Sequence, residues 1–83
     1  MVKYFMIVYA LKNKEKRVYV GMTNNLMRRF KEHNSGYVFS TKIHRPWELL
    51  YTEEVLSRGE ARKREKLLKS GFGKEFLKSL MPL

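Results

Sequence analysis

The chain has 83 residues, which is enough for one domain with a single modest core and too few for two. A hydrophobic content of 43% excludes general disorder. No apolar run reaches the ~20 residues of a membrane span. The absence of cysteine excludes disulfides and thiolate metal sites, so we expect a cytoplasmic protein. Its 18 Lys and Arg residues stand against eight acids, all glutamate, and the net charge of +10 indicates a polyanionic partner, with nucleic acid favoured over an anionic membrane.

The first predicted element is a strand over residues 4–11, a continuous apolar run rich in aromatic and branched side chains. Such a run is typical of a central strand that is covered on both faces. The polar segment 12–16 predicts a turn, and residues 17–21 predict the returning strand, in which Val18 and Val20 alternate with other residues. The chain is therefore expected to begin with an antiparallel hairpin.

Two tyrosines of this hairpin are candidate site residues. Tyr9 and Tyr19 lie on the same face only if the hairpin loop has an odd number of residues, because a shift of one residue turns a strand over. A loop of three residues, in which Lys12 pairs with Lys16, meets this condition, whereas a loop of two or four residues does not. We expect the odd-numbered loop, since a site would need both hydroxyls together.

An amphipathic helix is predicted after the hairpin, with Thr23 or Asn24 as its N-cap and with Gly36 placed to end it. One face carries four residues at i, i+3, i+4 and i+7 spacing: Leu26, Arg29, Phe30 and His33. A guanidinium and an imidazole one turn apart suit an anionic ligand such as phosphate. The alternative is that Arg29 and His33 border the apolar stripe, with the arginine stem covering apolar surface and its charge in water.

A surface loop is predicted over residues 35–46, which are polar, basic and aromatic. In such a loop Tyr37 or Phe39 is placed to stack on a base. The alternative, which applies to Phe39 and Trp47, is that the aromatic side chains pack on the core. The candidate nucleic-acid contacts are cations of this loop and of the solvated face of the preceding helix: Lys42, His44, Arg45, Arg28 and Lys31.

Three further elements complete the predicted fold. Residues 47–53 predict a third strand. Ser57 and Glu60 form an S-x-x-E capping box, which predicts a helix over residues 58–70, and a short terminal helix is predicted over residues 74–80. We therefore expect a single α/β (α+β) domain, residues 1–83, with a small three-stranded antiparallel sheet flanked by helices in the order β-β-α-β-α-α.

Glu65 occupies a position of the 58–70 helix where the periodicity calls for an apolar residue, on the face of Ala61 and Leu68. One interpretation is a functional carboxylate. The alternative is an i,i+4 ion pair with Lys69 on a solvated flank, and the pattern alone does not decide between them. Glu60, the other acid near this face, is already explained by the capping box.

The segment around Gly21 resembles a known signature. Tyr19-Val20-Gly21, followed by Thr23-Asn24 and then by Arg29 and His33, is similar to the second half of the signature of GIY-YIG nucleases, and most of all to their small single-domain members. The resemblance covers residues 4–68. Each of these short motifs is weak alone, and their order and spacing together make the resemblance fairly specific.

The first half of that signature is less complete. Ile7-Val8-Tyr9 stands where the first triplet would be, with isoleucine in place of its glycine. A rival alignment places Met6, and not Tyr9, at the first tyrosine position and requires a longer hairpin. Met22 stands where some branches of the family have a lysine, so that lysine's contribution is absent here.

The resemblance implies a metal-dependent endonuclease that hydrolyses phosphodiester bonds in DNA. In this comparison Tyr9 acts as the base with Tyr19 beside it, Arg29 contacts a non-bridging phosphate oxygen, and His33 accepts the proton of the tyrosine. Glu65 falls at the family's metal-binding glutamate and would hold a single Mg²⁺ or Mn²⁺ ion. Lys42 is a further, weaker candidate for this site.

Two other functions are compatible with the same residues. A basic nucleic-acid-binding module of this fold without catalysis shares the charge and the motifs, and a protein-interaction domain shares the charge for solubility. A ribosome-associated protein would also be basic, and the sequence leaves the oligomeric state open. Binding to nucleic acid that is sensitive to salt is expected of the first two, and Mg²⁺-dependent cleavage only of the nuclease.

Overall fold

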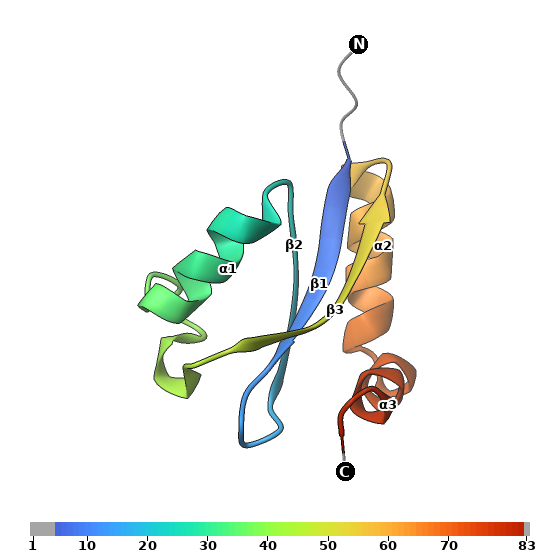
Figure 1. Ribbon diagram of the computed structural model, residues 1–83. Helices are drawn as coiled ribbons and strands as arrows, with labels where there is room; N and C mark the ends of the chain where they lie inside the picture. Colours follow the sequence, from blue (N-terminus) through green and yellow to red (C-terminus); the bar gives the residue numbers. More distant parts are fainter. Residues whose placement is uncertain (1–4, 83) are drawn as a thin grey trace.

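The computed structural model describes residues 5–82, so Tyr4 of the first predicted strand lies outside the described residues. The hairpin strands are β1 (Met6–Lys12) and β2 (Val18–Thr23), followed by helix α1 (Leu26–Ser35). A short 3₁₀ turn, η1 (Lys42–His44), leads into the third strand, β3 (Glu48–Val55), and helices α2 (Arg58–Lys69) and α3 (Gly71–Ser79) follow (Figure 1). This order confirms the predicted α+β fold. No helix within residues 5–82 has the length and apolar character that crossing a membrane requires.

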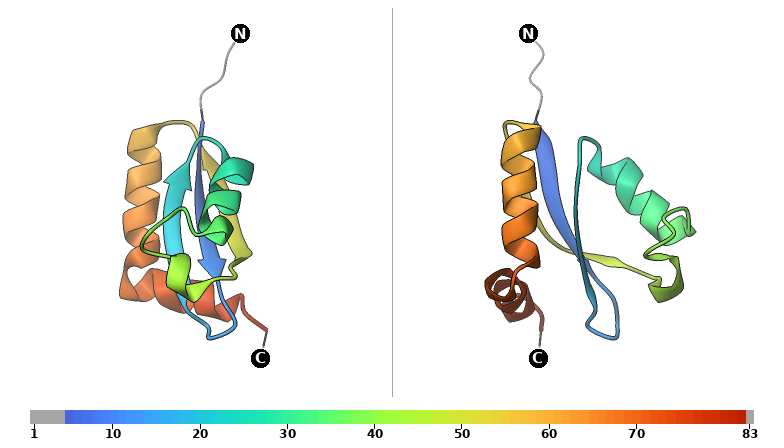
Figure 2. Two further views of the ribbon diagram at one scale, coloured as in Figure 1. Left: turned by 90° about the vertical axis from the view of Figure 1, so that its left-hand side faces the viewer. Right: turned by 180° about the vertical axis from the view of Figure 1, so that it is seen from behind.

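The sheet has the strand order β2-β1-β3, and β1 pairs antiparallel with both neighbours. Helix α1 covers one face of this sheet, and α2 and α3 cover the other (Figure 2). Because successive residues of a strand point to opposite faces, Val8 packs toward α2 and α3 while Tyr9 packs toward α1. Cover on both faces explains why the first strand is a continuous apolar run and confirms that it is central.

The hairpin loop differs from the predicted one. Lys12 pairs with Val18 and not with Lys16, so the loop has five residues instead of three. Asn13 closes it, because its backbone N–H donates to the Arg17 carbonyl and its side-chain oxygen accepts from the N–H groups of Glu15 and Arg17. The expected odd number is nevertheless correct, so Tyr9 and Tyr19 lie on the same face of the sheet.

Asn25 is the N-cap of α1, where the sequence had favoured Thr23 or Asn24. The side-chain oxygen of Asn25 accepts from the N–H of Arg28 at 3.1 Å. Thr23 instead uses its hydroxyl to accept from the N–H of Asn25, which fixes the turn before the helix. Gly36 ends α1 as predicted, with φ of 86°, a left-handed conformation that glycine adopts without steric cost.

The last two helices meet at Ser70. Ser57 caps α2 as predicted, its hydroxyl oxygen accepting from the N–H of Glu60 at 3.1 Å. Ser70 caps α3, which therefore begins at Gly71, three residues before the predicted start. Gly73 permits this close junction, because a Cβ atom there would collide with the backbone of Leu67 and Leu68.

The third strand covers Glu48–Val55 rather than residues 47–53. Trp47 precedes it and is buried against the α1 face of the sheet, as the packing alternative proposed for this residue. Its backbone N–H donates to the side-chain oxygen of Asn34 in α1, and the Asn34 amide donates to the Trp47 carbonyl at 3.0 Å. This exchange ties the end of α1 to the start of β3 and thereby positions the loop between them.

Candidate active site

The two hairpin tyrosines lie side by side beneath α1. Tyr9 pairs with Gly21, and Leu11 pairs with Tyr19, so the two tyrosines are diagonal neighbours on one face. Their ring centroids are 6.3 Å apart. Tyr9 is buried and Tyr19 is half-buried, so the two phenols have different access to solvent.

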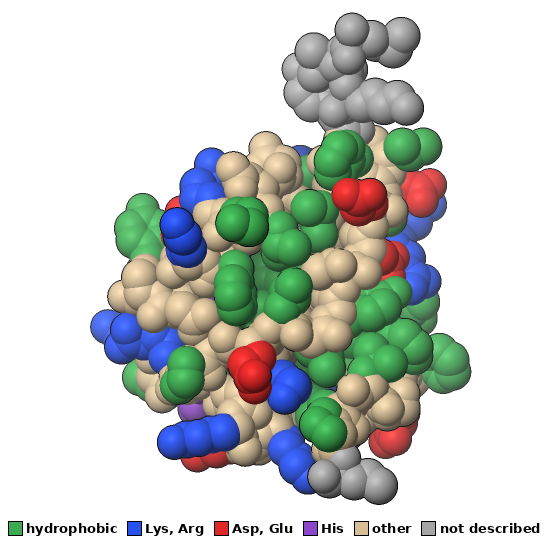
Figure 3. All heavy atoms as spheres, in the orientation of Figure 1, with side chains coloured by type: hydrophobic (Ala, Val, Ile, Leu, Met, Phe, Trp, Pro, Cys, Tyr) green, Lys and Arg blue, Asp and Glu red, His purple; other side chains and the backbone are tan. Residues whose placement is uncertain are grey.

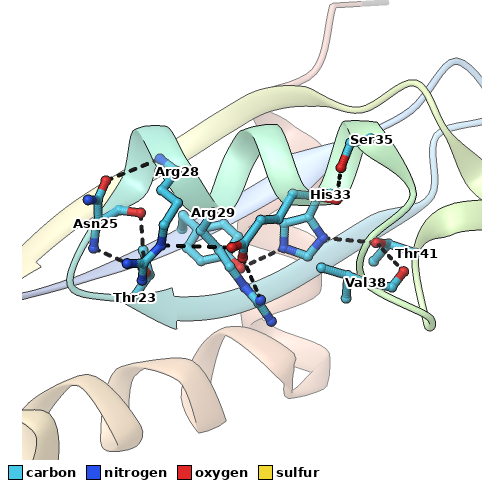
Figure 4. Close-up of polar contacts among 10 residues, drawn as sticks. Thr23, Asn25, Arg28, Arg29, His33, Ser35, Val38 and Thr41 are labelled. Atoms are coloured by element: carbon cyan, nitrogen blue, oxygen red, sulfur yellow. Dashed lines mark hydrogen bonds and ion pairs between the residues drawn. The ribbon is translucent and has the colours of Figure 1, made fainter.

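His33 of α1 is fully buried and contacts both tyrosine rings. Its Nε2 atom lies 2.8 Å from the Tyr9 hydroxyl, and its ring centroid lies 4.8 Å from that of Tyr19. Its Nδ1 atom lies 2.9 Å from the hydroxyl of Thr41, which in turn lies 3.4 Å from the Val38 carbonyl (Figure 4). The imidazole therefore connects the sheet to the loop that follows α1.

The direction of this chain of hydrogen bonds follows from its last member. The Val38 carbonyl can only accept, so the Thr41 hydroxyl donates to it. Thr41 then accepts from His33 Nδ1–H, which leaves Nε2 as the acceptor for the hydroxyl proton of Tyr9. We therefore assign a neutral His33 protonated on Nδ1, placed to receive the proton of Tyr9.

Burial keeps both members of the pair neutral. Desolvation raises the pKa of Tyr9 to about 12, with the Arg29 guanidinium beside it acting in the opposite direction. Desolvation also lowers the pKa of His33 to about 4, and the positive charge of Arg29 adds to this shift. In the free protein the proton therefore resides on Tyr9, and the phenolate does not form in advance.

Gly21 makes room for the Tyr9 hydroxyl. A Cβ atom at position 21 would lie 2.6 Å from the Tyr9 hydroxyl oxygen and 3.1 Å from a ring carbon of Tyr19. Real Cβ atoms essentially never come as close as 2.6 Å to another atom of this kind, so glycine fits here because of the close contact and not because of its backbone conformation. This is a physical reason for glycine directly after Tyr19-Val20.

Arg29 lines a polar cavity. Its guanidinium donates to Glu32 at 2.9 Å, and Glu32 also pairs with Arg28 at 3.8 Å. The cavity, of about 230 Å³, is lined by residues of β1, of the end of β2, of the β2–α1 turn, of α1 and of the start of α2: Met6, Met22, Thr23, Asn24, Arg28, Arg29, Glu32 and Arg58. Three guanidiniums and one carboxylate give it a positive balance that suits a phosphate.

Glu65 lies on α2, which covers the face of the sheet opposite α1. The carboxylate is half-buried and pairs with Lys69 at 3.3 Å, which is the ion pair that the sequence offered as the alternative. Its charge contributes to the raised pKa of Tyr9, so it lies within electrostatic range of that hydroxyl. It does not line the cavity at Arg29. Within residues 5–82, no three His, Cys, Asp or Glu side chains gather into a metal-binding group.

The predicted nucleic-acid contacts lie on the α1 side of the molecule. Arg28, Lys31, Lys42 and Arg45 are exposed, and His44 is half-buried beside Trp47. Figure 3 shows Lys and Arg side chains over α1 and the loop after it. Phe39 is exposed, so the alternative that it packs on the core is wrong for this residue.

Sequence reasoning missed three residues of this region. Thr41 orients the imidazole, Glu32 holds two arginines, and Arg58 reaches the cavity from a different helix. No local pattern marks Thr41 or Arg58, because their roles depend on how the loop and α2 pack. Glu32 did carry a signal, since its spacing from Arg28 and Arg29 permits ion pairs on one helix.

Comparison with known proteins identifies the family of this chain. The model of the GIY-YIG catalytic domain matches residues 5–78, which is most of the chain. The chain belongs to the GIY-YIG family. The family is a nuclease superfamily, so the resemblance noted from Tyr19-Val20-Gly21 and the residues after it is confirmed at the level of the family.

The similar proteins carry family names rather than activities. A UPF0213 protein of Clostridium perfringens is 41% identical over 63 residues, covering 75% of this chain and 68% of that protein. A UPF0213 protein of Staphylococcus haemolyticus is 36% identical over 74 residues, covering 88% and 90%. The solution NMR structure of a UPF0213 protein from Bacillus halodurans is 35% identical with a TM-score of 0.56, covering 92% of this chain and 84% of that one.

Proposed function

We propose that this GIY-YIG protein is a metal-dependent endonuclease that hydrolyses phosphodiester bonds in DNA. The observation that carries the proposal is the buried contact between the Tyr9 hydroxyl and His33 Nε2, 2.8 Å apart. The charge of Arg29 acts on both groups, and Arg29 lines a cavity together with two further arginines. A purely structural tyrosine–histidine pair would not need the cations next to it. Hydrolysis needs both parts, a proton acceptor for water and positive charge for the phosphate.

Tyr9 and His33 would move the proton of the attacking water. As the water oxygen bonds to phosphorus, its proton passes to the Tyr9 oxygen while the original Tyr9 proton passes to His33 Nε2. The bond between phosphorus and the leaving oxygen then breaks, the leaving oxygen takes a proton from water, and His33 releases its extra proton to solvent, which its lowered pKa favours. This exchange avoids a free phenolate, which the raised pKa of Tyr9 disfavours. Thr41 keeps Nε2 free to accept, because it binds the proton on Nδ1. Tyr19, the more exposed phenol, would border the incoming water.

Arg29 would exchange Glu32 for a phosphate oxygen. Its ion pair with Glu32 is partly exposed, so a substrate phosphate competes for the guanidinium at modest cost. The charge on the phosphate oxygens grows during the attack, and a guanidinium in contact with them then stabilises the transition state more than the substrate. Arg28 and Arg58, on the wall of the same cavity, would hold the phosphates next to the one that is cut.

A single Mg²⁺ or Mn²⁺ ion would be held at Glu65. The fit rests on a half-buried carboxylate within electrostatic range of Tyr9, whose ion-pair partner, Lys69, is exposed and can turn into solvent. A lone carboxylate with waters on the remaining positions is a coordination that Mg²⁺ accepts. When bound there, the ion supplies charge for the leaving oxygen.

The second candidate is a nucleic-acid-binding module of the same fold without catalysis. The ion pairs of Glu65 with Lys69 and of Arg29 with Glu32 favour it, since each accounts for a candidate catalytic side chain without a reaction. Both functions predict binding that weakens as salt rises. Only the nuclease should cleave the bound DNA when a divalent cation is added.

Nicking of supercoiled plasmid in Mg²⁺ or Mn²⁺, with EDTA as the blank, tests the proposal. We expect the wild type to nick and Glu65→Gln to lose at least ~100-fold of the rate while still binding DNA. Glu60→Gln is the matched control, since it removes the same charge from an exposed position five residues earlier in α2. No cleavage of duplex, branched or single-stranded DNA by the wild type would favour the binding module instead.

A further inference from the structure

The loop between α1 and β3 presents three large apolar side chains to solvent. Phe39 is 84% exposed, Ile43 is 77% exposed and Tyr37 is 76% exposed. A single exposed apolar residue is ordinary on a protein surface. Here three such residues lie within residues 37–43, a segment that we call the aromatic loop.

The backbone of the aromatic loop is anchored at its centre and at both ends. Thr41 is buried, and its carbonyl accepts from the Trp47 indole N–H at 2.9 Å. At one end the Tyr37 N–H donates to a carbonyl of α1, and at the other the Asn13 side chain donates to the His44 carbonyl at 3.1 Å. The apolar side chains are therefore held outward by a fixed backbone, and their exposure is not a result of loose packing.

Cations lie among these apolar side chains. The Lys42 ammonium is 5.5 Å from the centre of the Phe39 ring. The Arg45 Nε–H donates to the Lys42 carbonyl at 2.7 Å, and its guanidinium lies close to Gly36. Residues 35–47 contain no acid. Flat aromatic faces mixed with cations match the chemistry of a strand that offers both bases and phosphates.

A hollow beside the loop completes the surface. It is a shallow, open depression of about 490 Å³, lined by Asn34, Lys42, Ile43, Arg45 and Pro46. Its walls combine apolar side chains with two cations. A paired duplex hides its base faces by stacking, so it offers the rings of Tyr37 and Phe39 no face on which to stack.

We propose that the aromatic loop binds unpaired DNA bases, so that the substrate of this protein has a single-stranded region. The loop follows α1 directly, and Figure 2 shows both on the same side of the sheet. Helix α1 has ten residues and is therefore ~15 Å long, so a strand lying along it would meet the arginine cavity near one end and the loop at the other. The proposal about binding stands on the loop alone, and its consequence for cleavage rests on the proposed nuclease function.

Fluorescence anisotropy with labelled oligonucleotides, in EDTA to prevent cleavage, tests the proposal. The probes are an oligo-dT strand of about 15 nucleotides and the duplex it forms with oligo-dA. We expect the wild type to bind the single strand more tightly than the duplex at equal salt. The double variant Tyr37→Ala/Phe39→Ala should lose about 10-fold or more of its affinity for the single strand and little for the duplex.

Phe72→Ala is the matched control. Phe72 is 78% exposed on α3, on a different element, so its loss removes the same chemistry without touching the loop. All three variant positions are exposed, and the folded state should survive in each, which circular dichroism checks. We expect Phe72→Ala to bind both probes as the wild type does.

The base-binding proposal and the proposed nuclease function can fail separately, and the experiments tell the two apart. Equal affinity of the wild type for both probes, or an equal loss on both in the double variant, would overturn the base-binding proposal. If the wild type cuts no DNA and yet the double variant selectively loses the single strand, the loop proposal stands and the nuclease function fails. If plasmid is nicked by the wild type and the double variant binds both probes normally, the loop proposal fails and the nuclease function stands.

Discussion

The hydroxyl of Tyr9 on the central strand lies 2.8 Å from His33 Nε2 on α1, and both side chains are almost completely buried. The contact joins two elements that are separated by 24 residues in the chain. It serves the fold, because each buried polar group satisfies the hydrogen-bonding capacity of the other. It also places a proton acceptor behind a phenol, which is the arrangement that the proposed hydrolysis uses.

Replacing Tyr9 by phenylalanine should lower the free energy of unfolding by ~1–2 kcal/mol, because His33 Nε2 is left buried without a donor. Urea denaturation measures this change. Tyr51→Phe is the control, since that hydroxyl also donates a hydrogen bond, to Glu53 at 2.8 Å, but is only half-buried. An equal loss of unfolding free energy in both variants would mean that the contact with His33 stabilises the fold no more than a half-buried hydrogen bond does.

Gly21→Ala should displace the Tyr9 ring, because the new Cβ would lie 2.6 Å from the hydroxyl oxygen. We expect a loss of ~1–3 kcal/mol of stability, seen as a lower melting temperature, together with slower plasmid nicking. Gly71→Ala is the control, since a Cβ there meets nothing within 4 Å. That variant should be unchanged or slightly more stable, as alanine favours a helix. Normal nicking by Gly21→Ala would contradict the placement of Tyr9 in the reaction.

The stability of the protein should fall as the pH drops from about 6.5 toward 4. His33 has a pKa of about 4 in the folded protein and the ordinary 6.5 when unfolded, so in this window the unfolded chain binds more protons. We expect a loss of ~1–3 kcal/mol across the window, measured by urea denaturation at each pH. His33→Gln should flatten the profile there. A profile for this variant that parallels the wild type would show that another group titrates.

Glu32→Gln should tighten binding to DNA. The change releases Arg28 and Arg29 from the same carboxylate, so both guanidiniums become available to phosphates. The plot of log affinity against log salt should steepen, by ~1 for each added phosphate contact. Glu48→Gln, which frees Lys12 on the sheet, changes the net charge equally and is the control. A similar gain in both variants would assign the effect to net charge and not to the cavity.

Local patterns predicted the elements of the fold, and tertiary contacts decided how the site is put together. The i, i+4 spacing predicted that Arg29 and His33 share one face of α1. Strand alternation predicted that Tyr9 and Tyr19 share a face of the sheet only if the hairpin loop has an odd number of residues. The loop length itself depends on the hydrogen bonds of Asn13, a buried polar residue that the sequence does not distinguish from its neighbours.

Sequence patterns did not identify the residues whose roles in the site depend on how loops and helices pack. Thr41 accepts from His33 eight residues away, and this contact depends on the path of the loop. Arg58 enters the cavity because α2 begins beside the β2–α1 turn, which is a consequence of packing. Phe39 and Trp47 looked alike in the sequence, and only the fold shows that one is exposed and the other is buried.

The most direct measurement is the rate at which Tyr9→Phe nicks plasmid in Mg²⁺, compared with the wild type under conditions where both bind all of the DNA. The account predicts at least a ~100-fold slower rate with unchanged binding, because the phenylalanine ring fills the same space but can neither accept the proton of water nor pass one to His33. Nicking by this variant at the rate of the wild type would contradict the account.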